Sequence, residues 1–213
     1  MKIEATTVAE LRRRTNASMM DCKNALVEAQ ADLEKAEVIL RKKGQVIAAK
    51  KASRQVKDGV VASYIHLGGK VGVLVEVNCE TDFVAKNDKF KEMVKDITLQ
   101  IAASSPVCVS RTDVAPDILA REKEIASAQI KGKPQNVIDK IVEGKLEKYY
   151  QTVCLMEQAF VKNPDITIKD LVSQKVAEIG ENIVIRRFVR YQVGEEIGGA
   201  KPAEAAEVAP AAA

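Results

Sequence analysis

The stretch Asn78-Cys79-Glu80-Thr81-Asp82-Phe83-Val84-Ala85 is the most informative segment of this chain. It follows residues 71–77, whose alternating pattern predicts a strand, and leads into residues 84–103, whose period predicts a helix. An acid and an aromatic, Asp82 and Phe83, therefore sit at a strand-to-helix junction, where both can project from the body of the protein. Such a pair suits insertion into a partner better than it suits chemistry. The local alternative is that Thr81 or Asp82 only caps the helix while Phe83 turns inward, and the segment by itself favours that alternative.

The strand before this segment belongs to a predicted hairpin. Residues 60–66 form the other arm, and Leu67-Gly68-Gly69-Lys70 supplies the glycines that a tight turn requires. Near the end of the chain, residues 183–193 mix charged and apolar side chains, which is typical of a strand with one face in water. The hairpin occurs once, so no internal repeat of the sheet is predicted.

The remaining elements of this part of the chain are predicted to be helical. Residues 116–150 carry two apolar stripes separated by Lys131-Gly132-Lys133-Pro134, which predicts a helical hairpin with its turn at 131–134. A shorter helix over 168–179 is expected to end at Gly180.

The chain divides into three regions by composition and period. Residues 1–55 are predicted as three short helices, the third ending at Gly44, followed by a linker over 47–54 that is able to adopt helix. Residues 56–194 hold the strands and the longer helices, and we expect them to form a core domain. Residues 195–213 are rich in Ala and Pro and are predicted to be a disordered tail.

Composition argues against a membrane protein and against an enzyme. The 213 residues contain no apolar run near the roughly 20 residues that span a bilayer, and no signal pattern at the start, so a cytoplasmic location is expected. The four cysteines form no Cys-x-x-Cys pair and are expected to be reduced thiols. The single histidine, His66, has no nucleophile at a recognisable motif spacing, and the glycines at 68 and 69 lie between strands, unlike a phosphate-binding loop. No catalytic residue, metal or cofactor is therefore expected.

The N-terminal region is basic, which raises the question of its partner. Residues 1–55 hold 12 basic and 7 acidic residues, whereas the whole chain has a net charge of only +3. This charge suits nucleic acid or an acidic protein surface. No aromatic residue for base stacking occurs in residues 1–55, so a solvated face or a protein contact is favoured, and no direct nucleic-acid partner is expected. Adjacent methionines such as Met19 and Met20 are more often core than contact residues, but neighbouring helical positions point about 100° apart, so both cannot easily be central core and one can lie at the surface.

Three motifs resemble those of the elongation factor Ts (EF-Ts) family, in the family's order. The first is Leu11-Arg12-x-x-Thr15-x-Ala17-x-Met19-Met20-Asp21-Cys22-Lys23-x-Ala25-Leu26. The second runs from Glu76 to Ala85 and contains the opening segment, and the third is Gly180-Glu181-Asn182-Ile183 with Arg186-Arg187. The resemblance covers residues 1 to about 194. It implies an α+β protein with a three-helix, ubiquitin-associated-like (UBA-like) N-terminal domain, and a core with a three-stranded antiparallel sheet, packed helices and a helical hairpin.

The resemblance also implies a partner and a role. The partner is the translational GTPase EF-Tu, in its GDP-bound and nucleotide-free forms, and the role is to promote GDP release by disturbing the Mg²⁺ and phosphate site, without making or breaking bonds. Longer family members carry two related core halves, but only one is visible here, so we expect a homodimer joined through the core. The implied EF-Tu contacts are Thr81, Asp82, Phe83 and Val84 at the junction, and Leu11, Arg12, Met19 and Met20 in the N-terminal module.

Overall fold

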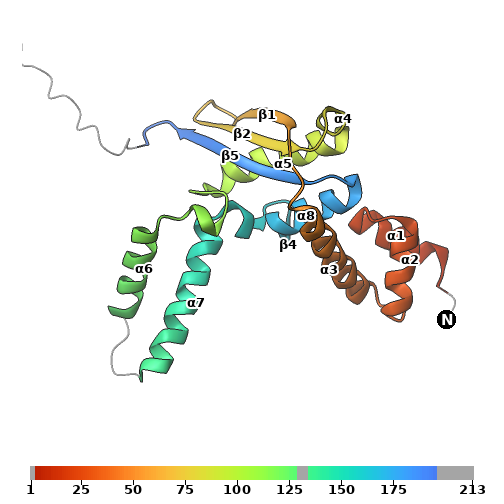
Figure 1. Ribbon diagram of the computed structural model, residues 1–213, viewed down its shortest axis with the longest axis horizontal. Coiled ribbons are helices and arrows are strands. Elements are labelled where there is room, and N and C mark those ends of the chain that lie inside the picture. The colour runs from red at the N-terminus through yellow and green to blue at the C-terminus, as the bar shows by residue number, and fades with distance from the viewer. Residues whose placement is uncertain (1–2, 129–133, 196–213) are drawn as a thin grey trace, which may run out of the picture.

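A three-stranded antiparallel sheet forms the centre of the fold. The computed structural model describes residues 3–128 and 134–195. Its strands are β1 (Asp58–Ile65), β2 (Val71–Cys79) and β5 (Ile183–Gln192), in the order β1-β2-β5. Both neighbouring pairs are antiparallel, and β5 pairs along the whole of β2 (Figure 1). The predicted sheet and the α+β class are thereby confirmed.

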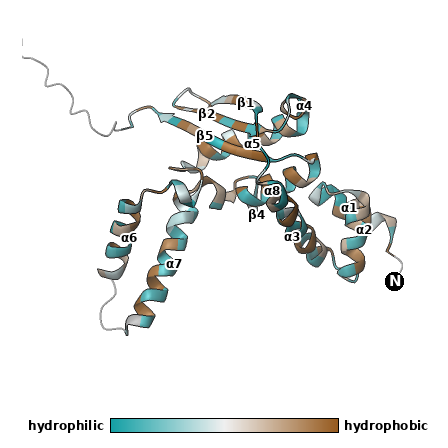
Figure 2. Ribbon diagram, in the orientation of Figure 1, coloured by the Kyte–Doolittle hydropathy of each residue, from teal (hydrophilic) through white to brown (hydrophobic). Residues whose placement is uncertain are grey.

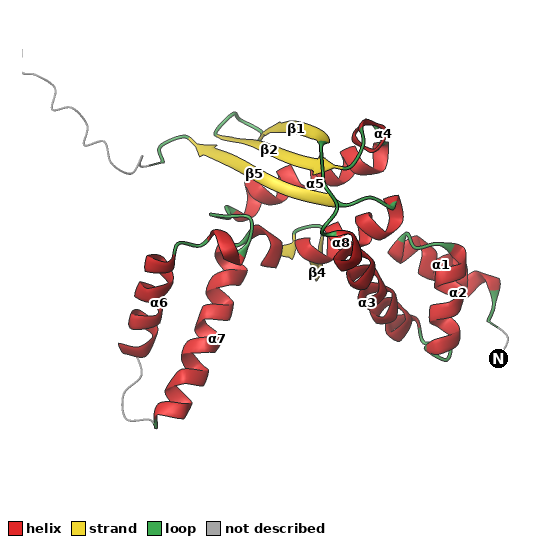
Figure 3. Ribbon diagram, in the orientation of Figure 1, coloured by secondary structure: helices red, strands yellow, loops and turns green. Residues whose placement is uncertain are grey.

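One face of the sheet is covered by helices. The alternation of β2 directs Val73, Val75 and Val77 to this face, where all three are buried. The helices α5 (Asp88–Ser104) and α8 (Ile168–Ile179) complete the core, and Figure 3 shows both beneath the strands. The buried apolar stripe of α5 consists of Phe90, Met93, Val94, Ile97 and Ile101.

The N-terminal helices have a core of their own. The helices α1 (Ala5–Thr15), α2 (Met19–Glu28) and α3 (Leu33–Lys51) enclose a separate buried cluster. Its members with the lowest exposure are Leu11, Cys22, Ala25, Leu26 and Ala36.

The third helix is longer than predicted, because it continues through Gly44 to Lys51. Gly44 does not break the helix but lies buried where α3 meets α8, and a side-chain carbon there would stand 3.7 Å from the carbonyl oxygen of Ser173. In the same region Gln45 donates a hydrogen bond of 2.8 Å to Asp170. The residues predicted as a linker are therefore mostly the last turns of α3, which attach the N-terminal module to the core.

The predicted helical hairpin is present as α6 (Pro116–Ala128) and α7 (Gln135–Val153), and it projects away from the sheet (Figure 1). Hydrophobic residues occur on both of its helices (Figure 2). At its root Arg111, in the 3-10 turn Arg111–Asp113, pairs with Glu147 at 2.7 Å and Glu157 at 3.0 Å. Of the predicted turn, residues 131–133 lie outside the described residues.

The structure differs from the sequence-based expectation in two other places. The helix predicted over 84–103 is two helices, α4 (Asp82–Ala85) and α5, because the side chain of Asn87 caps α5 by accepting a hydrogen bond of 2.8 Å from the amide of Lys89. A small second sheet of β3 (Ala159–Phe160) and β4 (Asn163–Thr167) was not predicted, since strands this short carry little pattern. It follows the 3-10 turn Leu155–Glu157. The predicted tail lies outside the described residues after Glu195.

Candidate functional site

The one-turn helix α4 presents Phe83 to solvent. Thr81 caps α4, its hydroxyl accepting a hydrogen bond of 3.4 Å from the amide of Val84. Ala85 is buried and Val84 packs partly against the core, so this turn has an inner side. Phe83 lies on the other side and is 81% exposed. The capping alternative is therefore correct for Thr81, whereas its second half, an inward Phe83, is wrong.

The backbone before α4 is held by a carboxylate from the other end of the chain. One oxygen of Glu181 accepts hydrogen bonds from the amides of Glu80 at 3.1 Å and Thr81 at 3.0 Å. Its other oxygen accepts from the hydroxyl of Thr81 at 2.7 Å. Glu181 lies in the turn between α8 and β5, about 100 residues away in sequence. The junction between β2 and α4 is thus braced from a neighbouring loop.

A second set of contacts joins the same two segments, but here the accepting carboxylate precedes α4 and the donating amide lies in the turn between α8 and β5. The carboxylate of Glu80 accepts a hydrogen bond of 2.6 Å from the amide of Asn182 and lies 3.5 Å from Arg54. We call Glu80, Thr81, Glu181 and Asn182 the junction clasp. The motifs that resembled the family contain all four residues, but the sequence carried no sign that they meet, and only Thr81 was predicted as a site residue.

The carboxylate of Asp82, next to Phe83, is ionised at neutral pH. Asp82 pairs with Lys86 one helical turn later, at 2.7 Å. The hydrogen bond from Lys86 holds the pKa of Asp82 below its ordinary value, so the carboxylate is ionised. Behind the junction Cys79 is fully buried, and desolvation raises the pKa of its thiol to about 11. The outer side of α4 therefore combines an exposed ring with an ion pair, and the thiol behind the junction is uncharged.

The N-terminal site residues separate into buried and exposed ones. Met19 and Met20 are 52% and 62% exposed at the start of α2, and Arg12 is exposed on α1. Leu11, in contrast, is fully buried within the three-helix cluster. Its side chain is not available at the surface, and its prediction as a direct contact is corrected to a packing role. Its helical position directs it toward α2 and α3, whereas the next residue, Arg12, points outward.

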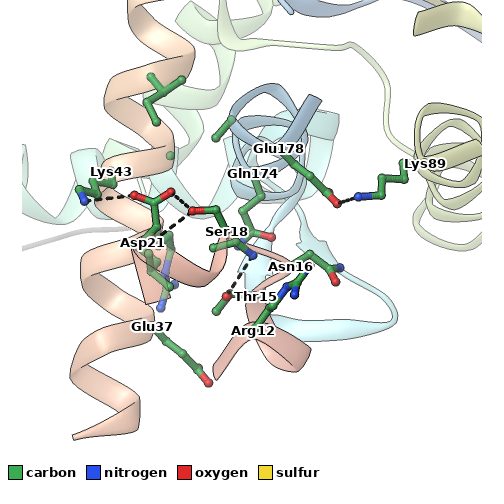
Figure 4. Close-up of a pocket in the computed structure, with 16 residues that line it drawn as sticks. Arg12, Thr15, Asn16, Ser18, Asp21, Glu37, Lys43, Lys89, Gln174 and Glu178 are labelled. Atoms are coloured by element: carbon green, nitrogen blue, oxygen red, sulfur yellow. Dashed lines mark hydrogen bonds and ion pairs between the residues drawn. The ribbon is translucent and has the colours of Figure 1, made fainter. Parts of the chain in front are cut away.

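A pocket of about 290 Å³ lies between the N-terminal module and the core (Figure 4). Arg12 lines it from α1, and Gln174 and Glu178 line it from α8. Lys89, near the start of α5, lines it as well and pairs with Glu178 at 2.6 Å. The pocket thus brings together α1, α8 and the beginning of α5, the helix that directly follows α4.

The basic N-terminal surface is partly neutralised within the chain. Arg13 and Arg14 pair with Glu10 at 2.9 Å and 2.8 Å, and Arg14 lies 3.3 Å from Glu37. Hydrogen bonds from the two arginines lower the pKa of Glu10 to about 2. This compensation weakens the case for these arginines as phosphate contacts.

Two kinds of feature are absent from the described residues. Over residues 3–128 and 134–195, no group of three or more His, Cys, Asp and Glu side chains is placed to hold a metal ion. Within the same ranges no helix has the length and apolar character needed to cross a membrane.

Comparison with known proteins identifies the family. The family model described as elongation factor TS matches residues 2–195. The elongation factor Ts of Carboxydothermus hydrogenoformans is 57% identical over 211 residues, covering 98% of this chain and 97% of the relative. That of Geotalea daltonii is 54% identical over 214 residues, with 100% and 99% covered, and that of Fervidobacterium nodosum is 57% identical over 197 residues, with 92% and 100% covered. The chain belongs to the elongation factor Ts family.

Proposed function

We propose that this chain binds EF-Tu in its GDP-bound and nucleotide-free forms and accelerates the release of GDP, so that GTP can bind in its place. It acts as an exchange factor that makes and breaks no bonds, in the cytoplasm, where translation elongation takes place. The observation that carries the proposal is Phe83, an aromatic ring 81% exposed on a short helix whose start is braced by the junction clasp.

The proposed action needs no contact between Phe83 and the nucleotide. A GTPase holds GDP through backbone amides and a Mg²⁺ ion with demanding geometry, so a small displacement of the elements around them weakens binding. Phe83 serves as the wedge that displaces a part of EF-Tu, Asp82 is its polar companion, and Thr81 and Val84 hold the turn. By linkage, the nucleotide weakens the binding of the factor as much as the factor weakens the binding of the nucleotide.

The N-terminal module supplies the second proposed contact. Arg12, Met19 and Met20 are exposed, and methionine adapts well to a partner surface. Leu11 contributes by holding α1 in the module.

The test is the release of a fluorescent GDP analogue, mant-GDP, from EF-Tu. Phe83→Ala is expected to slow factor-stimulated release at least about tenfold, because the wedge is lost while the clasp remains. The matched control is Val107→Ala, which removes another exposed apolar side chain, 75% exposed, from the loop after α5. Release as fast with Phe83→Ala as with the parent chain would remove the wedge from the proposal. The rival, a nucleic-acid-binding module in residues 1–55, predicts salt-dependent RNA binding that survives this substitution.

We also propose that the chain is a homodimer joined through the uncovered face of its sheet. The strand register places Ser63, Leu74 and Val189 in one row across this face, and Ile65 and Tyr191 in the next row. All but Ser63 are exposed large hydrophobic residues. Such a face suits burial against a second copy.

Sedimentation measures the oligomeric state directly. The parent chain is expected to sediment as a dimer at micromolar concentration, and Leu74→Glu as a monomer, because the new charge would be buried at the interface. A parent chain that sediments as a monomer at this concentration would contradict the proposal.

A further inference from the structure

The turn between α8 and β5 is fixed independently of α4. Gly180 ends α8 in the left-handed conformation, at φ +90°, and its amide donates a hydrogen bond of 3.0 Å to the carbonyl of Val176. Lys51, at the end of α3, donates a hydrogen bond to the carbonyl of Gly180. The buried side chain of Asn182 donates to the carbonyl of Arg54 at 3.0 Å. Helix α8 and the end of α3 therefore hold this turn from two sides.

Glu181 extends from this fixed turn to the start of α4. Its carboxylate receives the amides of Glu80 and Thr81, the last two residues before the helix, together with the hydroxyl of Thr81. The same hydroxyl accepts the hydrogen bond from the amide of Val84 inside α4. One side chain thus links a fixed turn both to the backbone that enters α4 and to the cap of α4.

Apart from the hydrogen bond between the Glu80 carboxylate and the amide of Asn182, the remaining contacts near α4 leave its direction less determined. The pair of Asp82 with Lys86 lies within one exposed segment and does not anchor it to the core. Val84 and Ala85 anchor the inner side by packing, which is not directional. Hydrogen bonds to the amides of residues 80 and 81 constrain the path of the chain as it leaves the sheet, and so constrain where Phe83 points.

We propose that Glu181 is a positioning residue for nucleotide exchange, which holds α4 so that Phe83 meets EF-Tu in a productive orientation. This inference rests on the proposed function. Glu181 acts through Phe83 and needs no contact with the partner.

The experiment is a double-mutant cycle of Glu181→Ala and Phe83→Ala, read by mant-GDP release at increasing concentrations of the full-length factor. Glu181→Ala is expected to lower the maximal release rate about tenfold, with a smaller change in the concentration that gives half of that rate. The double variant is expected to be no slower than Phe83→Ala alone, because a misplaced ring and an absent ring have the same consequence.

Rescue by a conservative variant separates positioning from general loss of structure. Glu181→Gln keeps an oxygen for the two amides and gains an amide group that can donate to the hydroxyl of Thr81, so release within about threefold of the parent is expected. Glu157→Gln is the matched control, since Glu157 is also a half-buried carboxylate held by hydrogen bonds, but at the root of the helical hairpin. If circular dichroism shows that Glu181→Ala does not fold, Thr81→Val is the second variant. It removes only the shared hydroxyl and is expected to slow release as well.

The outcomes distinguish this inference from the proposed function. An inactive parent chain, or an unaffected Phe83→Ala, contradicts the proposed function. A slow Phe83→Ala beside a normal Glu181→Ala, with the parent active, overturns only the role of Glu181. Losses that multiply in the double variant also overturn it, because Glu181 would then act by a route other than Phe83.

Discussion

The two proposed contact regions are built in different ways. The N-terminal module is held by apolar packing among α1, α2 and α3, which are neighbours in sequence. The junction around Phe83 stands on the core sheet and is braced by hydrogen bonds between residues about 100 positions apart. We expect the first region to unfold as a local unit, whereas the second combines residues from distant parts of the chain.

This difference indicates where each region is vulnerable. Packing tolerates small shifts in direction and fails when buried volume is removed. A hydrogen-bonded junction keeps its direction, and it fails when backbone groups are displaced or left without partners. Substitutions in the two regions should therefore affect separate parts of the molecule.

The largest effect is expected from Leu11→Ala. Removing this fully buried side chain leaves a cavity in a thin core, and the free energy of unfolding is expected to fall by about 3 kcal/mol. Hydrogen exchange should accelerate in residues 5–40 while the amides of β2 stay protected. Equal loss of protection in both regions would show that the module is not a local unit.

A slightly smaller effect, confined to the sheet, is expected from Gly59→Ala. Gly59 has φ +151°, and a side-chain carbon there would lie 2.3 Å from the carbonyl oxygen of Val77 on the neighbouring strand. We expect a loss of about 2 to 3 kcal/mol in urea unfolding, with α1 and α2 protected as before. Gly144→Ala is the control, because nothing lies near that position in α7 and alanine favours helix. A neutral Gly59→Ala would mean that β1 can move away from β2 at little cost.

Alkaline pH is expected to weaken the core behind the junction. Burial raises the pKa of Cys79 to about 11, against an ordinary value of 9.0. A raised pKa in the folded state means that the stabilisation is complete below pH 9 and is lost as the pH rises toward 11, to a limit of about 3 kcal/mol, of which about 2 kcal/mol is lost by pH 10.5. Urea unfolding between pH 8 and 10.5 should therefore show a steeper decline for the parent than for Cys79→Ala. Parallel declines would contradict the assignment to this thiol.

The smallest effects on stability are expected at the exposed contacts themselves. Phe83→Ala and Met20→Ala each remove a side chain that is mostly in solvent, so each should change the free energy of unfolding by less than about 0.5 kcal/mol. Measuring both thermal unfolding and mant-GDP release on the same samples separates effects on stability from effects on function. A large destabilisation by Phe83→Ala would indicate that the ring supports the fold.

Much of the fold could be predicted because it follows from local patterns. The alternation of residues 71–77 predicted β2, and the apolar stripes of residues 116–150 predicted α6 and α7. One error arose where a distant contact changed the meaning of a residue. Gly44 resembles a helix stop in sequence, but it lies inside α3 because α8 passes close to it.

The sequence by itself determined most of the elements and indicated the family, because period and motif order are properties of neighbouring positions. Only the tertiary structure decided which site residues are accessible. It exposes Phe83 to solvent and buries Leu11 in the three-helix cluster. It also decided that Glu181 meets Thr81. The physical reason is that a hydrogen bond between residues 100 positions apart depends on how strands and helices pack, and no local pattern records that packing.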